Sequence, residues 1–264
     1  MVQVPEVFTK FVSSFAGCMG GNPDAPIWLV CDHSFKCDLP MDPTVKFANP
    51  QTDVNKLLRP LQCGCKFSES VGRLVNAIVG NEPSQVDKVF SPAGEEKEQP
   101  VLMLSASPVC IGLLEPQAWI EKPAVKTDKG VVTMAEYTGL PTFKDFINFL
   151  IETRGALFRQ TEEEKSPKII LCRDMLKAND YFKMFGADRT NVQANDFFLM
   201  APVKREDGSV RTLVFVTDML GFGADNMNFE NELELRQAGE EIRHYAHNVF
   251  GDGWLGNYAG VFLK

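Results

Sequence analysis

The sequence is poor in basic residues and in histidine, and it has no long hydrophobic run. Lysine and arginine together number 27 against 35 aspartates and glutamates, which gives a net charge of −8. Tight non-specific binding of nucleic acid depends on many Lys and Arg contacts with phosphate, so this balance disfavours it. A local basic patch remains compatible with an acidic chain. No segment reaches the roughly 18 consecutive apolar residues of a membrane-spanning helix, so we expect no membrane partner.

A disulfide-framework pattern of cysteines is also missing. The seven cysteines are an odd number and are scattered along the chain, which is typical of a reducing compartment, and we expect a cytoplasmic location. Residues 1–18 lack a basic segment followed by a long apolar core, and their periodicity indicates an amphipathic helix rather than a signal peptide.

Metal-ligand spacings are scarce. Only one residue separates Cys63 from Cys65, and three histidines are too few to complete a typical set, so we expect neither a metal nor another cofactor. His244 and His247 have the i, i+3 spacing of one helix face, but solvent-facing positions near a helix end are the simpler interpretation.

What the sequence does contain is a set of short, continuous apolar runs of strand length, typical of strands that are buried on both faces of a parallel sheet. They are residues 27–31, 101–104, 168–172 and 212–216. Segments with helical periodicity alternate with them, at residues 68–79, 142–158 and 231–250. This order predicts a three-layer α/β/α sandwich with a central, mainly parallel four-stranded sheet, formed by one domain over residues 1–264. Residues 197–203 and 210–216 flank Asp207-Gly208 and predict a hairpin.

The candidate functional residues are those that follow the predicted strands, because ligands of open parallel sheets bind beyond the carboxyl ends of the strands. The stretches are 31–36, 105–110, 172–174 and 217–228. Each also has a purely structural interpretation. Asp32 and His33 fit a turn cap equally well, and Arg173 fits the start of a helix, with an acid after it that favours the helix dipole. The apolar side chains of the glycine-rich stretch 220–227 suggest a protein partner or a closing lid.

Three stretches carry a resemblance to a known family. They are GGNPDAPIWLV at 20–30, LPTFKDFINFLIETRGALFRQ at 140–160 followed by SPKIILC at 166–172, and TLVFVTDMLGFGADNMNF at 212–229. In order and spacing they resemble the uracil-DNA glycosylase superfamily, in which a single α/β/α domain excises a flipped-out base.

The resemblance implies a role for each candidate residue. It places the catalytic groups at Asp32, His33 and Asp218, with His33 at the position of the water-activating residue. Base-binding roles fall on Phe35, Ser105 and Ser107. DNA-binding roles fall on residues after the predicted strands and in the glycine-rich stretch, at Lys36, Arg173, Leu220, Phe222, Asn226 and Asn228.

The motifs depart from the family pattern in a way that bears on the substrate. Ser105 stands where uracil-reading members carry an asparagine, and a smaller side chain leaves room for a bulkier base. We therefore expect hydrolysis of the N-glycosidic bond of a non-standard base in DNA, such as the modified bases of phages, with a role in phage defence. Two alternatives stay open. One is a catalytically inactive protein of the same fold that binds a nucleotide or a protein partner, and the other is an interaction protein that uses the loop Leu220–Met227.

Overall fold

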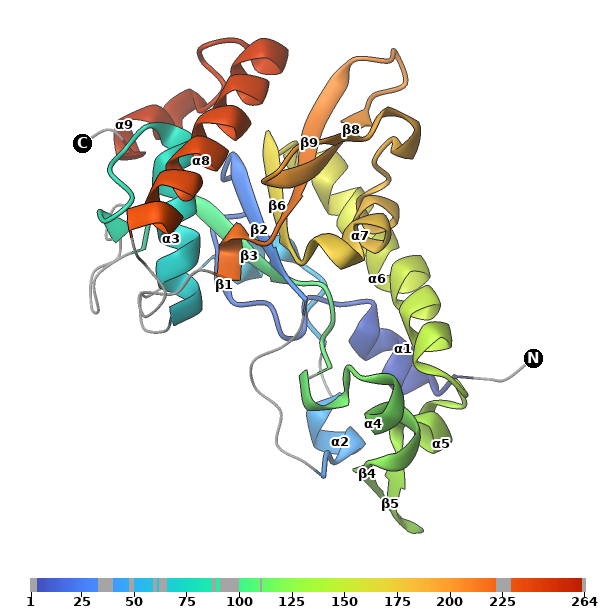
Figure 1. Ribbon diagram of the computed structural model, residues 1–264. Helices are drawn as coiled ribbons and strands as arrows, with labels where there is room; N and C mark the ends of the chain where they lie inside the picture. Colours follow the sequence, from blue (N-terminus) through green and yellow to red (C-terminus); the bar gives the residue numbers. More distant parts are fainter. Residues whose placement is uncertain are drawn as a thin grey trace.

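The core of the protein is a seven-stranded sheet. The computed structural model describes residues 4–32, 40–47, 50–58, 61, 66–86, 89–90, 100–109, 111–221 and 229–262. Across the sheet the strands run β1 (Gly20–Gly21), β3 (Val101–Ser105), β2 (Ile27–Cys31), β6 (Ile169–Arg173), β9 (Val210–Thr217), β8 (Phe198–Lys204) and β7 (Gln193–Ala194), as Figure 1 shows.

The four strands predicted from the apolar runs lie next to one another in the sheet. The β3–β2, β2–β6 and β6–β9 pairs are all parallel. The predicted total of four strands is wrong, because β1 pairs antiparallel with β3, β8 with β9 and β7 with β8. Two of these additions are two-residue strands, which are too short to leave a periodic signal in the sequence. The predicted hairpin is confirmed as β8–β9, and Gly208 takes a positive φ of 84° in its turn.

Helices cover both faces of the sheet (Figure 1). Strand β2 shows the reason, because all five of its residues are buried and the first four alternate between two hydrophobic clusters. Ile27 and Leu29 face α3 (Lys66–Val79) and α8 (Phe229–Phe250), and Trp28 and Val30 face the side of α1, α6 and α7. Full burial of such a side chain stabilises the fold by about 1.5–3 kcal/mol. The helices on this second face are α1 (Glu6–Val12), α6 (Phe143–Lys165) and α7 (Ala178–Phe185).

Helix α6 forms the long wall of the second face. It begins with a capping box in which Thr142 and Asp145 satisfy each other's backbone N–H groups. It extends beyond the predicted 142–158 to Lys165, although the sequence TEEEK has no apolar periodicity. The last turns are held by Glu162, which is fully buried and accepts hydrogen bonds from Arg211 and Thr212.

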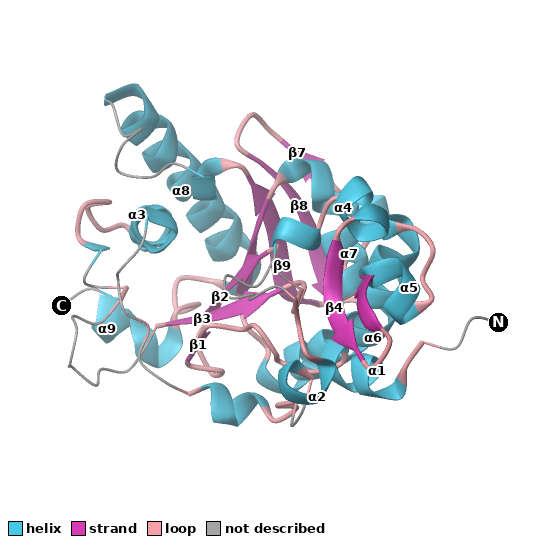
Figure 2. Cartoon of the chain, turned by 90° about the horizontal axis from the view of Figure 1, so that it is seen from below, coloured by secondary structure: helices cyan, strands magenta, loops and turns pink. Residues whose placement is uncertain are grey.

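A small excursion projects between β3 and α6. It contains α4 (Pro116–Glu121), a hairpin of β4 (Pro123–Thr127) and β5 (Gly130–Thr133), and α5 (Met134–Thr138), and Figure 2 shows it beside the start of α6. Helix α2 (Pro43–Lys46) lies against β4.

The remaining described elements are short. They are η1 (Val54–Leu57), η3 (Ile111–Leu113), η4 (Met175–Lys177), η5 (Arg189–Asn191), η6 (Met219–Gly221), η8 (Gly256–Tyr258) and α9 (Ala259–Phe262). None of the helices in the described ranges is both long enough and apolar enough to cross a membrane.

Candidate functional site

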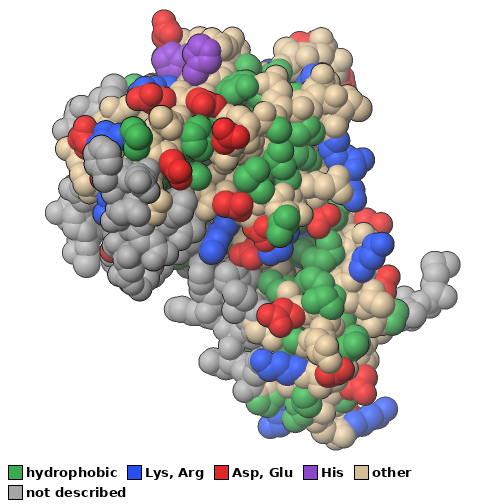
Figure 3. All heavy atoms as spheres, in the orientation of Figure 1, with side chains coloured by type: hydrophobic (Ala, Val, Ile, Leu, Met, Phe, Trp, Pro, Cys, Tyr) green, Lys and Arg blue, Asp and Glu red, His purple; other side chains and the backbone are tan. Residues whose placement is uncertain are grey.

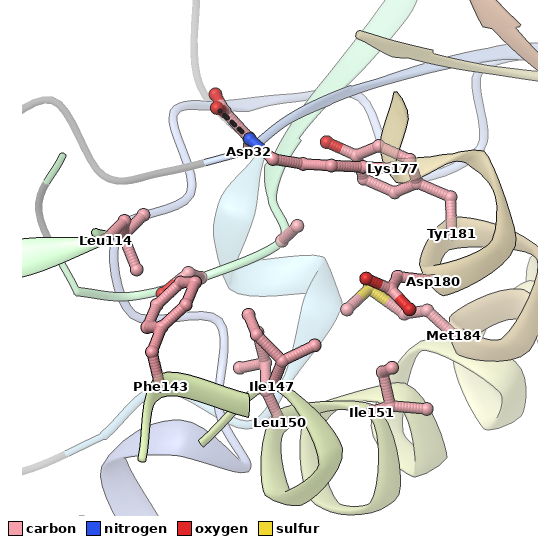
Figure 4. Close-up of a pocket in the computed structure, with 12 residues that line it drawn as sticks. Asp32, Leu114, Phe143, Ile147, Leu150, Ile151, Lys177, Asp180, Tyr181 and Met184 are labelled. Atoms are coloured by element: carbon pink, nitrogen blue, oxygen red, sulfur yellow. Dashed lines mark hydrogen bonds and ion pairs between the residues drawn. The ribbon is translucent and has the colours of Figure 1, made fainter. Parts of the chain in front are cut away.

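The candidate site lies where the strand order of the parallel sheet reverses. Strand β2 is the first parallel strand in the sequence, and its neighbours are the second, β3, and the third, β6. Connections from the two sides of such a point diverge and leave a crevice at the carboxyl ends of the strands. A cavity of about 280 Å³ opens there, lined by residues that follow β2, β3 and β6 and by α6 and α7. We call it the switch-point cavity (Figure 4).

The walls of the switch-point cavity are mostly apolar. Helix α6 presents a stripe at i, i+4, i+7 and i+8, which is the spacing of one helix face. The apolar lining consists of Phe143, Ile147, Leu150 and Ile151 from this stripe, Met184 from α7, and Leu114, together with the small Ala106. Figure 4 labels all of these side chains except Ala106 and shows the labelled ones pointing into a common space. Such a lining suits a largely apolar group.

Lys177 and Asp32 form the polar end of the cavity, and Asp174 pairs with Lys177 from outside the lining. The Lys177 Nζ lies 3.0 Å from Asp32 Oδ2 and 3.0 Å from Asp174 Oδ2. Burial disfavours the charged form of this lysine, but the hydrogen bonds and charges of the two carboxylates outweigh it and raise the pKa of Lys177 above its ordinary value. The ammonium group therefore stays charged at neutral pH.

The loop that carries Lys177 has an unusual backbone. Asp174 takes a positive φ of 79°, which is rare for a residue other than glycine, and its side chain accepts a hydrogen bond from Leu176 N at 3.1 Å. Asp218, at the end of β9, accepts from Met175 N at 3.0 Å. These two contacts hold the short helix η4 in position over the cavity.

Tyr181 and Asp180 contribute further polar groups from α7, and Ser107 contributes one from the end of β3. Only 3% of Tyr181 is exposed, and its hydroxyl has no hydrogen-bond partner among the described residues. Burial, followed by the nearby Cys172 and Asp32, raises the pKa of Tyr181 well above its ordinary value, so the hydroxyl remains protonated.

Two of the predicted site residues, Asp32 and Ser107, line the cavity. Ser105 does not. It is buried at the end of β3, where its hydroxyl donates to Ser107 O at 2.6 Å and its own carbonyl oxygen accepts from Arg154 Nε at 2.9 Å. The Ser105 hydroxyl is therefore occupied by a hydrogen bond to the backbone. Because the side chain does not line the cavity, a serine at this position does not enlarge it.

Asp218 and Arg173 lie near the site but outside the cavity lining. Asp218 is exposed and caps the backbone of the loop after β6. Arg173 is the last residue of β6 and is half-buried.

The prediction that Leu220 contacts DNA from an exposed loop is wrong. Leu220 is 1% exposed, because η6 turns back against α3 and its side chain joins the hydrophobic cluster on that face of the sheet. The remaining predicted residues lie outside the described ranges and are His33, Phe35, Lys36, Phe222, Asn226 and Asn228.

The structure adds residues that the sequence interpretation did not select. Tyr181 and Asp180 lie in the middle of a helix, where polar and aromatic residues are ordinary, and the apolar stripe of α6 is equally typical of a helix packed against a core. The alternation of polar and apolar residues indicates a helix, but it does not distinguish a cavity wall from a filled core.

The two described histidines have separate partners. His244 Nε2 lies 2.9 Å from Asn248 Nδ2, and His247 Nδ1 lies 3.1 Å from Asp252 Oδ1. Figure 3 shows them at the outer end of α8. Within the described ranges, no three His, Cys, Asp or Glu side chains converge as metal ligands would.

Comparisons with protein-family models, with curated proteins and with solved structures found no match to this chain.

Proposed function

We propose that this chain is a glycosylase-like hydrolase that takes a nucleobase into the switch-point cavity and cleaves the bond between that base and its sugar. The observation that carries the proposal is the position of Asp32, whose carboxylate lies at the polar end of an otherwise apolar cavity directly after the first parallel strand. The order of the three sequence stretches that resemble the uracil-DNA glycosylase superfamily supports the same conclusion.

The cavity suits the base of such a substrate. An enzyme that acts on a base in DNA turns the nucleotide out of the stack and holds the base by stacking and by hydrogen bonds at its edge. Phe143 and the aliphatic stripe of α6 supply apolar surface, and Ser107, Asp180 and Tyr181 supply the few polar groups. Because apolar surface predominates, a base that carries an added apolar or bulky substituent fits better than one with many polar groups. We propose a non-standard base of the kind found in phage DNA, and hence a role in phage defence.

The polar end of the cavity suits the chemistry. Cleavage of the C1′–N bond leaves its electron pair on the departing base and positive charge on the sugar. The Asp32 carboxylate stabilises that positive charge, and the Lys177 ammonium, held 3.0 Å from it, stabilises the negative charge on the base. A water molecule then adds to C1′. The proton that this water loses protonates the departing base.

An abasic-site assay tests the proposal. The substrates are single-stranded and duplex oligonucleotides that contain uracil, hypoxanthine, or a pyrimidine with an apolar substituent such as 5-methylcytosine, and cleavage is read as strand breakage after alkali. Asp32→Asn should reduce the rate at least about 100-fold, since one positioned charge in a catalytic site is worth several kcal/mol. Asp207→Asn, in the exposed turn between β8 and β9, is the matched control and should leave the rate within about twofold, because an asparagine oxygen still accepts from Ser209 N.

A second candidate function is binding without cleavage. The Asp32–Lys177 contact favours it, because an aspartate that is already paired with an ammonium group offers less charge to a sugar. Retained binding of a base, with no strand breakage in any substrate, would select this alternative.

A further inference from the structure

Asp174 has a strained backbone conformation. It takes φ 79° and ψ 94°, which lies beyond the left-handed region that aspartate visits in ordinary turns. Among the described residues, Ser166 is the other non-glycine residue with a positive φ, and its φ of 51° and ψ of 54° are ordinary for the end of a helix. Strained conformations cost free energy, and they concentrate at functional sites.

The side chain and the backbone of Asp174 together fix the residues that follow it. Oδ1 accepts from Leu176 N at 3.1 Å, and Oδ2 lies 3.0 Å from Lys177 Nζ. The Asp174 carbonyl oxygen also accepts from Lys177 N at 3.0 Å. These contacts set the direction in which the Lys177 side chain leaves the short helix η4.

Lys177 has two carboxylate partners, one on each side of the crevice. Its Nζ also lies 3.0 Å from Asp32 Oδ2, and Figure 4 shows the lysine side chain extended toward that carboxylate. One ammonium group and two carboxylates carry a net charge of −1, whereas Asp32 and Lys177 alone would be neutral. Asp174 lies outside the cavity lining, so it acts on a ligand without touching it.

We propose that Asp174 is a positioning residue for the cleavage reaction, which holds the Lys177 ammonium group and supplies its counter-charge, so that the Asp32 carboxylate keeps its negative charge for the sugar. The inference rests on the proposed function. An aspartate whose sole partner is an ammonium group exerts little field at the sugar, because the two opposite charges cancel. A second carboxylate restores the negative field without filling the cavity, and it gives the strained backbone of Asp174 a function.

The test compares Asp174→Asn with a matched variant, Asp188→Asn. Asparagine removes the charge of Asp174, but its side-chain oxygen still accepts from Leu176 N, and asparagine tolerates a positive φ. Asp188 has the same kinds of contact elsewhere. It begins the short helix η5, accepts from Thr190 N at 3.0 Å, and its Oδ2 lies 2.7 Å from Lys204 Nζ. A purely structural loss should therefore be alike in the two variants.

The kinetic readout is the abasic-site assay on the oligonucleotide that the wild type cleaves fastest. Asp174→Asn should lower kcat about tenfold and change KM by less than about twofold, because the charge acts on the transition state and not on binding of the base. Asp188→Asn should leave both constants within about twofold. Asp174→Gly suits the positive φ and removes both side-chain contacts, so it should lower kcat at least as far.

A second readout does not depend on cleavage. Burial lowers the pKa of Lys177, but the hydrogen bonds and charges of Asp32 and Asp174 outweigh it. Titration of the Lys177 Cε signal by NMR, between about pH 8 and 12, should therefore give a lower midpoint in Asp174→Asn than in the wild type or Asp188→Asn. The other ionisable side chains around the crevice are the same in every variant, and they are Arg173, Asp180, Tyr181 and Asp218.

Three outcomes overturn the inference. They are an unchanged Lys177 midpoint in Asp174→Asn, a loss of activity that appears in KM alone, and an equal loss of kcat in Asp188→Asn. Cleavage by the wild type with an unchanged kcat in Asp174→Asn would refute the positioning role and leave the hydrolase standing. No cleavage of any oligonucleotide by the wild type would refute the hydrolase and with it the role in cleavage, whereas a lowered midpoint would still show that Asp174 holds Lys177.

Discussion

Lys177 and Asp32 are 145 positions apart in the sequence, yet Lys177 Nζ lies 3.0 Å from Asp32 Oδ2. The contact joins the loops that follow two neighbouring parallel strands, β2 and β6. Lys177 also contacts Asp174 within its own loop. Lys177 and Asp32 therefore bridge the crevice where the strand order reverses, and they line one end of the cavity.

Replacing Lys177 with Met should destabilise the protein by about 0.5–1 kcal/mol near neutral pH, since the lysine is half-exposed and its ion pairs are screened by solvent. The pKa of Lys177 is raised in the folded state, so the pairs stabilise the fold fully below the ordinary pKa of lysine, about 10.4. The difference in free energy of unfolding between wild type and variant should hence shrink as the pH rises above that value. Urea denaturation at pH 7, 9 and 11 measures this difference.

Lys144→Met, at an exposed position on α6, is the control and should show no such trend. If the difference in free energy of unfolding grew at alkaline pH, the raised pKa of Lys177 in the folded state would be contradicted.

Replacing Arg154 with Met should lower the free energy of unfolding by at least about 3 kcal/mol, because several backbone carbonyl oxygens lose their hydrogen-bond donor at once. The Arg154 side chain is fully buried and donates to Ser105 O at 2.9 Å, Ser14 O at 2.5 Å and Ala16 O at 2.8 Å. Arg154→Lys keeps a charged donor and should recover part of the loss. Equilibrium urea denaturation of both variants checks this, and a loss below about 1 kcal/mol in the Met variant would show that water replaces the guanidinium.

Under the proposed function, replacing Leu176 with Ala should reduce cleavage of duplex DNA about tenfold and leave cleavage of single strands unchanged. The Leu176 side chain is 97% exposed and directly precedes Lys177. Apolar side chains at such positions enter the base stack when a nucleotide is turned out, a step that single strands do not require. Because the side chain has almost no contacts to lose, stability should stay within about 0.5 kcal/mol. Leu233→Ala, at a partly exposed position on α8, is the matched control. An equal effect on both substrates would rule out this role.

Under the proposed function, the affinity of the chain for DNA should depend only weakly on the salt concentration. Among the described residues, the cavity lining contains one cation, Lys177, and the carboxylates Asp32 and Asp180, while Arg173 and Asp174 lie next to it in the chain segment that follows Cys172. Two cations neutralise at most about two phosphates, so the slope of log K against log salt should be about −2 or shallower. Fluorescence anisotropy of a labelled oligonucleotide between about 50 and 200 mM salt measures it. A slope steeper than about −5 would place most phosphate contacts away from these residues.

The central strands could be predicted from the sequence because their signal is local. Each of β2, β3, β6 and β9 is a continuous apolar run, and a strand buried on both faces requires such a run whatever its neighbours are. The position of Asp32 follows from the same signal, since it is the first residue after β2 and parallel strands present their carboxyl ends at one edge.

The composition of the site was decided by tertiary structure. Leu220 is an apolar residue in a glycine-rich stretch, and only the return of η6 against α3 buries it, while Leu176, in a similar local context, is left exposed. Tyr181 is unremarkable on its helix until the ends of β2 and β6 enclose its hydroxyl without a partner. The local sequence thus determined which segments are buried, because burial of a strand depends on its own apolar surface. Which side chains meet in the cavity depended on contacts between segments more than 100 residues apart, which no local pattern encodes.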